Sequence, residues 1–131
     1  MIVLLGPDRL QITAPAAISP FPIALQWYVS WEIFPVPALP YNRVHGLYAG
    51  APPLFITPPI IAVEEFVIRE VSVFNPNALP VDFDIQINGP AVTLFRCLLG
   101  PNHILKYNAC PGQFMGWQIF DGNGSLVSAD S

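Results

Sequence analysis

The chain has 131 residues, of which 53% are hydrophobic, 11% are charged and 16 are proline, and its formal net charge is −4. That length suffices for one domain with a core of its own. An average soluble domain is about 25% charged, so this chain has too little charge to cover a monomer, and we expect contacts with other proteins. Its few basic residues are scattered, which argues against a nucleic-acid partner. They are Arg9, Arg43, Arg69, Arg96 and Lys106.

Two charge-free stretches, residues 10–31 and 44–63, are long enough to cross a bilayer. Several prolines interrupt each of them and would break the continuous helix that a membrane span requires. We therefore expect no membrane partner. The first five residues are apolar and lack the basic start of a secretory signal, so no export is expected.

Residues 1–47 consist of short apolar runs separated by prolines. Because proline removes a donor from the strand ladder, the runs at 2–5, 10–14 and 23–34 indicate edge strands or an extended arm. In the longest run every odd position from Ile23 to Ile33 is apolar, which predicts a strand with one buried face. Residues 34–40 are typical of a stiff linker. The sequence thus predicts a proline- and aromatic-rich N-terminal arm over 1–47.

Residues 48–131 show regular strand-length runs separated by turn residues, a pattern typical of a sandwich or barrel. No segment has a sustained helical period with caps. The predicted fold is all-β: an antiparallel β-sandwich or jelly-roll-like barrel with an extended, proline-rich N-terminal arm. The expected strands are 66–74, 81–88, 92–99, 104–107, 114–120 and 126–128, and the expected turns lie at 75–77, 88–90, 100–102, 111–112 and 121–124.

Two of these strands have contrasting patterns. Residues 81–88 alternate between apolar and polar side chains, which predicts a strand with one buried and one wet face. Residues 92–99 have apolar side chains on both faces. Either Phe95 and Leu99 or, alternatively, Leu94 and Leu98 are then expected to contact a partner subunit.

The candidates for chemistry are weaker than their structural alternatives. Asp82 and Asp84 lie on one strand face at a spacing near the range of inverting glycosidases, yet a solvated strand face is the favoured interpretation. His45 and His103 belong to no ligand or nucleophile motif. Residues 121–125 resemble a calcium loop but lack its later glycine and glutamate, so a hairpin turn is favoured. We expect no enzyme, no cofactor and no metal site.

Two cysteines, Cys97 and Cys110, are too few for a disulfide scaffold or a zinc site. Without export, reduced thiols are the expected state, although a bridge across neighbouring strands stays open.

Aromatic residues on the second face of a charge-poor segment match the composition of interface anchors. The expected interface residues, with the pair from the two-sided strand, are Phe21, Tyr28, Phe34, Tyr41, Tyr48, Phe95 and Leu99.

The run Ile-Arg-Glu-Val-Ser-Val-Phe-Asn at 68–75, followed by Phe-Asp-Ile-Gln-Ile-Asn-Gly at 83–89, resembles small β-sandwich virion proteins of tailed bacteriophages. In that family successive strands follow the patterns Arg-x-Ile-x-Val-x-Asn and Val-x-Leu-x-Ile-Asn-Gly, and Phe-Ile-Thr-Pro-Pro at 55–59 stands where a segment precedes the first strand. The similarity covers about residues 47–127. The segment before it matches no motif of the family.

The resemblance implies a capsid decoration or cement protein, often trimeric, that contacts the major capsid protein or other virion proteins. Its expected location is the virion, assembled in the host cytoplasm, and tail, baseplate or head-completion stations stay open. A carbohydrate- or receptor-binding sandwich is the alternative, in which Trp117 and Tyr107 would stack on sugars. A glycan-cleaving enzyme using Asp82 and Asp84 is the third and most remote interpretation.

Overall fold

A computed structural model describes residues 1–15, 21–34, 42–50, 52–61, 63–88, 91–110 and 114–130. These residues form eleven strands and contain no helix, and therefore no helix that could cross a membrane. The strands are β1 (Val3–Leu5), β2 (Arg9–Thr13), β3 (Leu25–Phe34), β4 (Asn42–Tyr48), β5 (Leu54–Phe55), β6 (Glu65–Phe74), β7 (Val81–Asn88), β8 (Val92–Leu99), β9 (Ile104–Asn108), β10 (Gly116–Phe120) and β11 (Leu126–Asp130).

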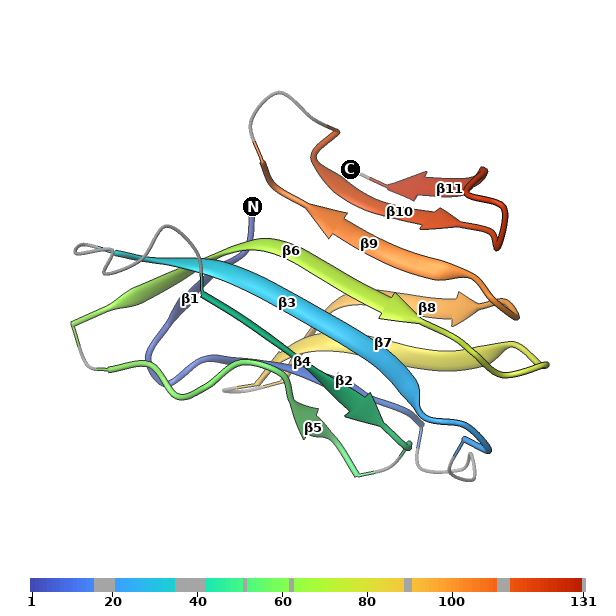
Figure 1. The fold of residues 1–131 in the computed structure, drawn as a ribbon. Helices are drawn as coiled ribbons and strands as arrows, with labels where there is room; N and C mark the ends of the chain where they lie inside the picture. The colour runs from blue at the N-terminus through green and yellow to red at the C-terminus, as the bar shows by residue number, and fades with distance from the viewer. Residues whose placement is uncertain are drawn as a thin grey trace.

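The strands form two antiparallel sheets that pack face to face, which confirms the predicted all-β sandwich (Figure 1). The larger sheet has seven strands in the order β11-β10-β9-β6-β3-β4, and β1 also pairs with β6. The smaller sheet has the order β5-β2-β7-β8. β1 and β9 share one edge of β6, because β1 lies opposite Glu65 to Val67 and β9 lies opposite Glu70 to Phe74.

The predicted N-terminal arm is wrong for the described residues. β2 lies between β5 and β7, and β3 lies between β4 and β6, so both are interior strands of the sandwich. Leu10, Ile12 and Leu25 are fully buried. The described prolines of this region stand outside the ladders: Pro7 lies in the turn before β2, Pro15 follows β2, and Pro22 precedes β3. They mark loops between strands, which is why they suggested an arm. The predicted linker after Phe34 lies outside the described residues.

Two strands were not predicted, β4 and β5. β4 includes Gly46, which offers no side chain to an alternating pattern. Gly46 lies opposite Trp27 of β3, and a Cβ atom on it would stand 2.8 Å from Cζ2 of that indole. The glycine is therefore needed so that the buried Trp27 ring can lie against the backbone of β4.

The core lies between the sheets and is built from alternate residues of each strand. Val81, Phe83 and Ile85 of β7 point inward, as their alternation predicts. Stacked rings join the layers at the β8 and β10 side, where the ring centroids of Phe95 and Trp117 are 4.9 Å apart.

Three of the predicted turns are described. Asn102 adopts a positive φ of 59° in the turn between β8 and β9. In the turn between β10 and β11, Oδ1 of Asp121 accepts hydrogen bonds from the backbone N–H groups of Asn123 and Ser125, both at 2.9 Å. The hairpin interpretation of this segment is confirmed. The expected turns at 88–90 and 111–112 lie wholly or partly outside the described residues.

Deleting residues 1–40 removes β1, β2 and β3, and with them one interior strand of each sheet. We expect the remaining chain to lack a cooperative unfolding transition in urea, because β6 and β7 then lose their neighbouring strands and the core loses the side chains of β2 and β3. Far-ultraviolet circular dichroism during urea titration measures this against the full chain. A cooperative transition in the shortened chain would restore the division into arm and domain.

Candidate protein interface

An apolar groove lies at the end of the sandwich where the chain crosses from β6 in the larger sheet to β7 in the smaller one. Its volume is about 630 Å³. Three segments form it: the residues before β3, the β6–β7 loop with the start of β7, and the end of β8. The residues that line this groove are Phe21, Pro22, Ile23, Asn77, Ala78, Leu79, Pro80, Val81, Asp82 and Leu98.

Large apolar side chains project from the groove into solvent. Leu79 is 72% exposed and Leu98 is 68% exposed, and Ile23 is also more than half exposed. Leu98 and Asp82 lie directly opposite each other on the outer face of the smaller sheet. A contiguous set of exposed aliphatic side chains marks a surface that another protein can cover.

Asn75 fixes the shape of the β6–β7 loop. Its side-chain Nδ2 donates to the carbonyl oxygens of Leu79 (3.0 Å), Leu99 (2.9 Å) and Gly100 (3.1 Å). Its backbone N–H donates to the carbonyl of His103 at 3.1 Å. Asn75 is fully buried, so these bonds form in a low dielectric and one amide holds the loop to the end of β8.

Asn77 fixes the opposite wall of the groove. Its Oδ1 accepts from the backbone N–H of Ile23 at 2.9 Å, and its Nδ2 donates to the carbonyl of Ile23 at 2.8 Å. Asn75 supports Asn77 in turn, because Oδ1 of Asn75 accepts from both the backbone N–H and Nδ2 of Asn77, each at 2.9 Å. The groove is therefore ordered before a partner arrives, which lowers the entropic cost of binding.

Asp82 is the charged residue among those that line the groove. Its neighbour Asp84 is engaged elsewhere, since its two carboxylate oxygens accept from Nε and Nη2 of Arg96 at 3.0 and 3.3 Å. Asp84 is buried, so the expectation of a solvated acidic face is wrong for this residue. A carboxylate held by arginine on both oxygens is a structural ion pair.

Two of the predicted interface residues lie near the groove: Phe21 lines it, and Tyr48 packs against Phe21. Phe21 lines the groove but is itself largely buried, with its ring edge-on to Tyr48 at 5.8 Å. Tyr48 is buried, its hydroxyl oxygen accepts from the backbone N–H of Ala14 at 3.0 Å, and burial raises the pKa of that hydroxyl. Tyr48 is therefore a core residue, and its assignment to an interface is corrected.

The side chains on the two faces of β8 differ in burial. Leu99 is fully buried, which corrects its assignment to an interface, and Phe95 is partly buried beneath the stacked ring of Trp117. Leu98 projects outward instead. The bulge that shifts the β7–β8 register lies before Phe95, so alternation counted from the start of the strand does not give its faces.

Tyr28 and Phe34 are partly buried at positions of β3 that point away from the core. Tyr28 lines a hollow of about 360 Å³ on the outer face of the larger sheet, together with His45, Leu47 and Phe74. The groove and this hollow are on different elements, so the structure does not bring all predicted residues together. Tyr41 lies outside the described residues.

Leu79 and Ile23 of the groove were missed as interface residues. Leu79 follows Asn-Pro-Asn-Ala in a turn, where a leucine is unusual because turns favour polar residues. Leu79 is therefore the residue by which the sequence could have indicated the groove. Leu98 belongs to the alternative pair of contact residues that the sequence predicts for β8, and its exposure is consistent with that role.

The residues expected to stack on sugars are buried. Trp117 and Tyr107 pack together with centroids 4.9 Å apart, and the Tyr107 hydroxyl accepts from the backbone N–H of Ile2 at 3.1 Å. Their assignment to glycan binding is corrected. In the part of the chain that the structure describes, no three His, Cys, Asp or Glu side chains gather as a metal site requires.

Comparison of the chain with protein-family models, with curated proteins and with solved structures finds no match.

Replacing Asn75 by Ala should lower the free energy of unfolding by about 1 to 3 kcal/mol, because buried carbonyl and amide groups lose their partner. Urea denaturation measures the change. Asn123→Ala is the matched control: it lies in an exposed turn, and its effect should stay within about 0.5 kcal/mol. Equal effects of the two changes would contradict the role given to Asn75.

Burial, with a smaller effect of the nearby Asp82 charge, raises the pKa of the Cys97 thiol to about 12. Both cysteines are free thiols, and Cys110 is partly exposed. In Cys110→Ser, maleimide at neutral pH should label Cys97 slowly in the native protein and rapidly in urea, because the thiolate is the reactive form. Cys97→Ala, which leaves Cys110, should react faster when native. Rapid native labelling of Cys97 would contradict its burial.

Proposed function

We propose that this protein is a structural component that acts by packing against other protein chains, as a decoration or cement protein of a tailed-bacteriophage virion. The apolar groove is the observation that supports a packing role most directly. It combines exposed Leu79 and Leu98 with walls held by the amides of Asn75 and Asn77. Aliphatic side chains in a pre-ordered frame can anchor a partner without first losing conformational freedom.

The composition supports the same proposal. Only 11% of the residues are charged, and two of the basic side chains are in ion pairs with acidic ones, Arg69 with Glu32 and Arg96 with Asp84. Paired charges oppose association less than free ones do, because part of their field is neutralised locally. Apolar surface is thus left as the main determinant of contact.

The assignment to a virion depends on the resemblance of residues 47–127 to small phage sandwiches, and the proposed partners are the major capsid protein or other virion proteins. The proposed oligomeric state, a homotrimer, has the same origin. The proposal includes no catalytic step and no bound cofactor. Within the virion, a head position is proposed ahead of tail or baseplate positions.

Quantitative mass spectrometry of particles purified from the producing host tests the class of protein. A decoration protein should be present in hundreds of copies, as a covering of a capsid lattice requires. Absence of the chain from purified particles would overturn the proposal, and a few copies would move it to the tail or head–tail junction.

The double substitution Leu79→Ser with Leu98→Ser tests the groove. We expect the chain to fold with a free energy of unfolding within about 1 kcal/mol of the wild type, since both side chains are exposed, but to be lost from particles. Leu47→Ser with Val63→Ser is the matched control, because these residues are similarly exposed and lie away from the groove. Full incorporation of the groove variant would show that another surface makes the contact.

A further inference from the structure

β11 is the outermost strand of the seven-stranded sheet and has one free edge (Figure 1). It pairs with β10 on one side, and no described residue pairs with it on the other. Leu126 to Ala129 are all exposed, with Leu126 at 54% and Val127 at 52%. A free edge of this kind presents unpaired N–H and C=O groups that a further strand can bind.

The other outer strands have features that oppose such pairing. β5 has two residues and lies between the prolines at 52–53 and 58–59, and β1 has three residues. β4 has Arg43 and His45 at exposed positions, and β8 has the exposed Arg96 and a bulge. Short length, charge, proline and bulges are the means by which sheet edges avoid association. β11 also has a bulge, at Val127 between the residues that lie opposite Ile119 and Phe120 of β10, but its residues 126–129 include no charge and no proline.

We propose that β11 pairs antiparallel with β11 of a second copy of this chain, about a two-fold axis near Ser128, so that the two seven-stranded sheets become continuous. The strand is compatible with itself in this arrangement. Asp130 is its one charged residue, and antiparallel pairing places the two copies of Asp130 at opposite ends of the joined strands. No like charges then face each other at the centre of the contact.

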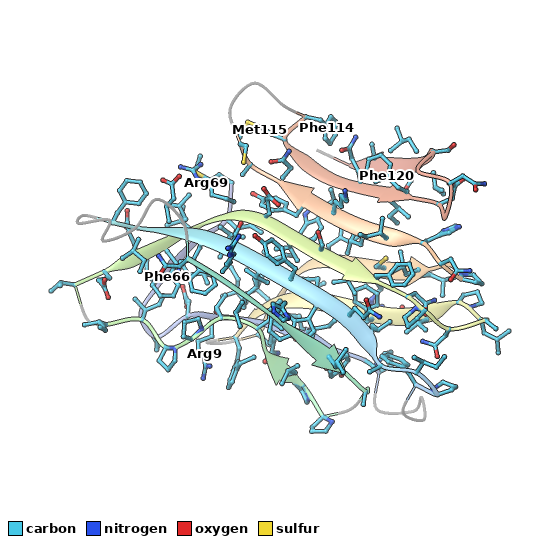
Figure 2. The ribbon with its side chains drawn as sticks, in the orientation of Figure 1. Arg9, Phe66, Arg69, Phe114, Met115 and Phe120 are labelled. Atoms are coloured by element: carbon cyan, nitrogen blue, oxygen red, sulfur yellow. The ribbon has the colours of Figure 1, made fainter. Side chains whose placement is uncertain are left out.

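Apolar residues beside β11 favour an occupant that also covers side chains. Leu126 lies opposite Phe120 at the end of β10, and Phe114 and Met115 are exposed just before β10 begins (Figure 2). An added strand next to β11 would shield Leu126 and Val127 from water. Five residues from each copy form a small contact, so the pair should dissociate on dilution.

This contact is separate from the apolar groove and needs no virion partner. A two-fold contact closes as a dimer by itself, and it would join two trimers into a hexamer if a three-fold contact also exists. The isolated protein should therefore contain an even number of copies at high concentration.

Ser128→Lys tests the pairing. Residue 128 is exposed, so the change should leave the melting temperature unaltered, but it places two ammonium groups opposite each other at the centre of the contact. Sedimentation equilibrium of the full chain over a range of concentrations should show half the wild-type number of copies, with the dissociation constant raised about tenfold or more. The matched control is Ser125→Lys, which adds the same charge to the exposed turn before β11.

A wild-type chain that stays monomeric or forms only trimers at high concentration would overturn the proposal. So would a Ser128→Lys chain that associates like the wild type, or a Ser125→Lys chain that dissociates equally. Dissociation caused by Leu79→Ser with Leu98→Ser and not by Ser128→Lys would place self-association in the groove and would likewise overturn pairing through β11.

Discussion

The side-chain amide of Asn75 lies where the chain passes from one sheet of the sandwich to the other, and the geometry of that end of the molecule depends on it. Its bonds to the carbonyls of Leu79, Leu99 and Gly100 join the loop after β6 to the end of β8. Through Asn77 the same network reaches Ile23, which precedes β3. A buried polar network whose members all have partners specifies one arrangement of the chain, since any other leaves amide groups unsatisfied. The exposed leucines of the groove owe their fixed positions to it.

The shortage of charge in the sequence has two different structural outcomes. At the groove, apolar side chains gather on loops and on a strand face, so a partner must match a shape. At β11, the backbone itself is open, so a partner must supply a strand. The two surfaces belong to opposite sheets, β8 to the smaller and β11 to the larger. Under the two proposals, one chain contacts a second copy through β11 and a different protein through the groove, which an assembly of many copies requires.

The strands in the second half of the chain were predicted well, because the signals that mark them lie within each strand and at its two ends. β7 and β8 have the predicted bounds, since alternation and flanking turn residues mark both ends. The supposed arm was wrong because prolines show where a ladder stops and say nothing about which strand lies alongside. β4 could not be found for a related reason: Gly46 makes sense only once Trp27 is known to lie over it. In the same way, alternation places Leu98 and Leu99 on opposite faces of β8, and only the packing of the two sheets shows that Leu99 is the buried one. The exposure of Leu79 depends on hydrogen bonds from Asn75, a residue four positions earlier.

The placement of β2 and β3 inside the sheets affects how the chain can fold while it is being synthesised. Leu10 of β2 pairs with Ile87 of β7, more than half the chain later, and Trp27 of β3 pairs with Val73 of β6. Interior strands made first must wait for neighbours made much later, and such non-local pairing is slow. Until then their apolar faces are open to other nascent chains. Efficient production of this protein should therefore depend on low temperature or on chaperones that cover β2 and β3.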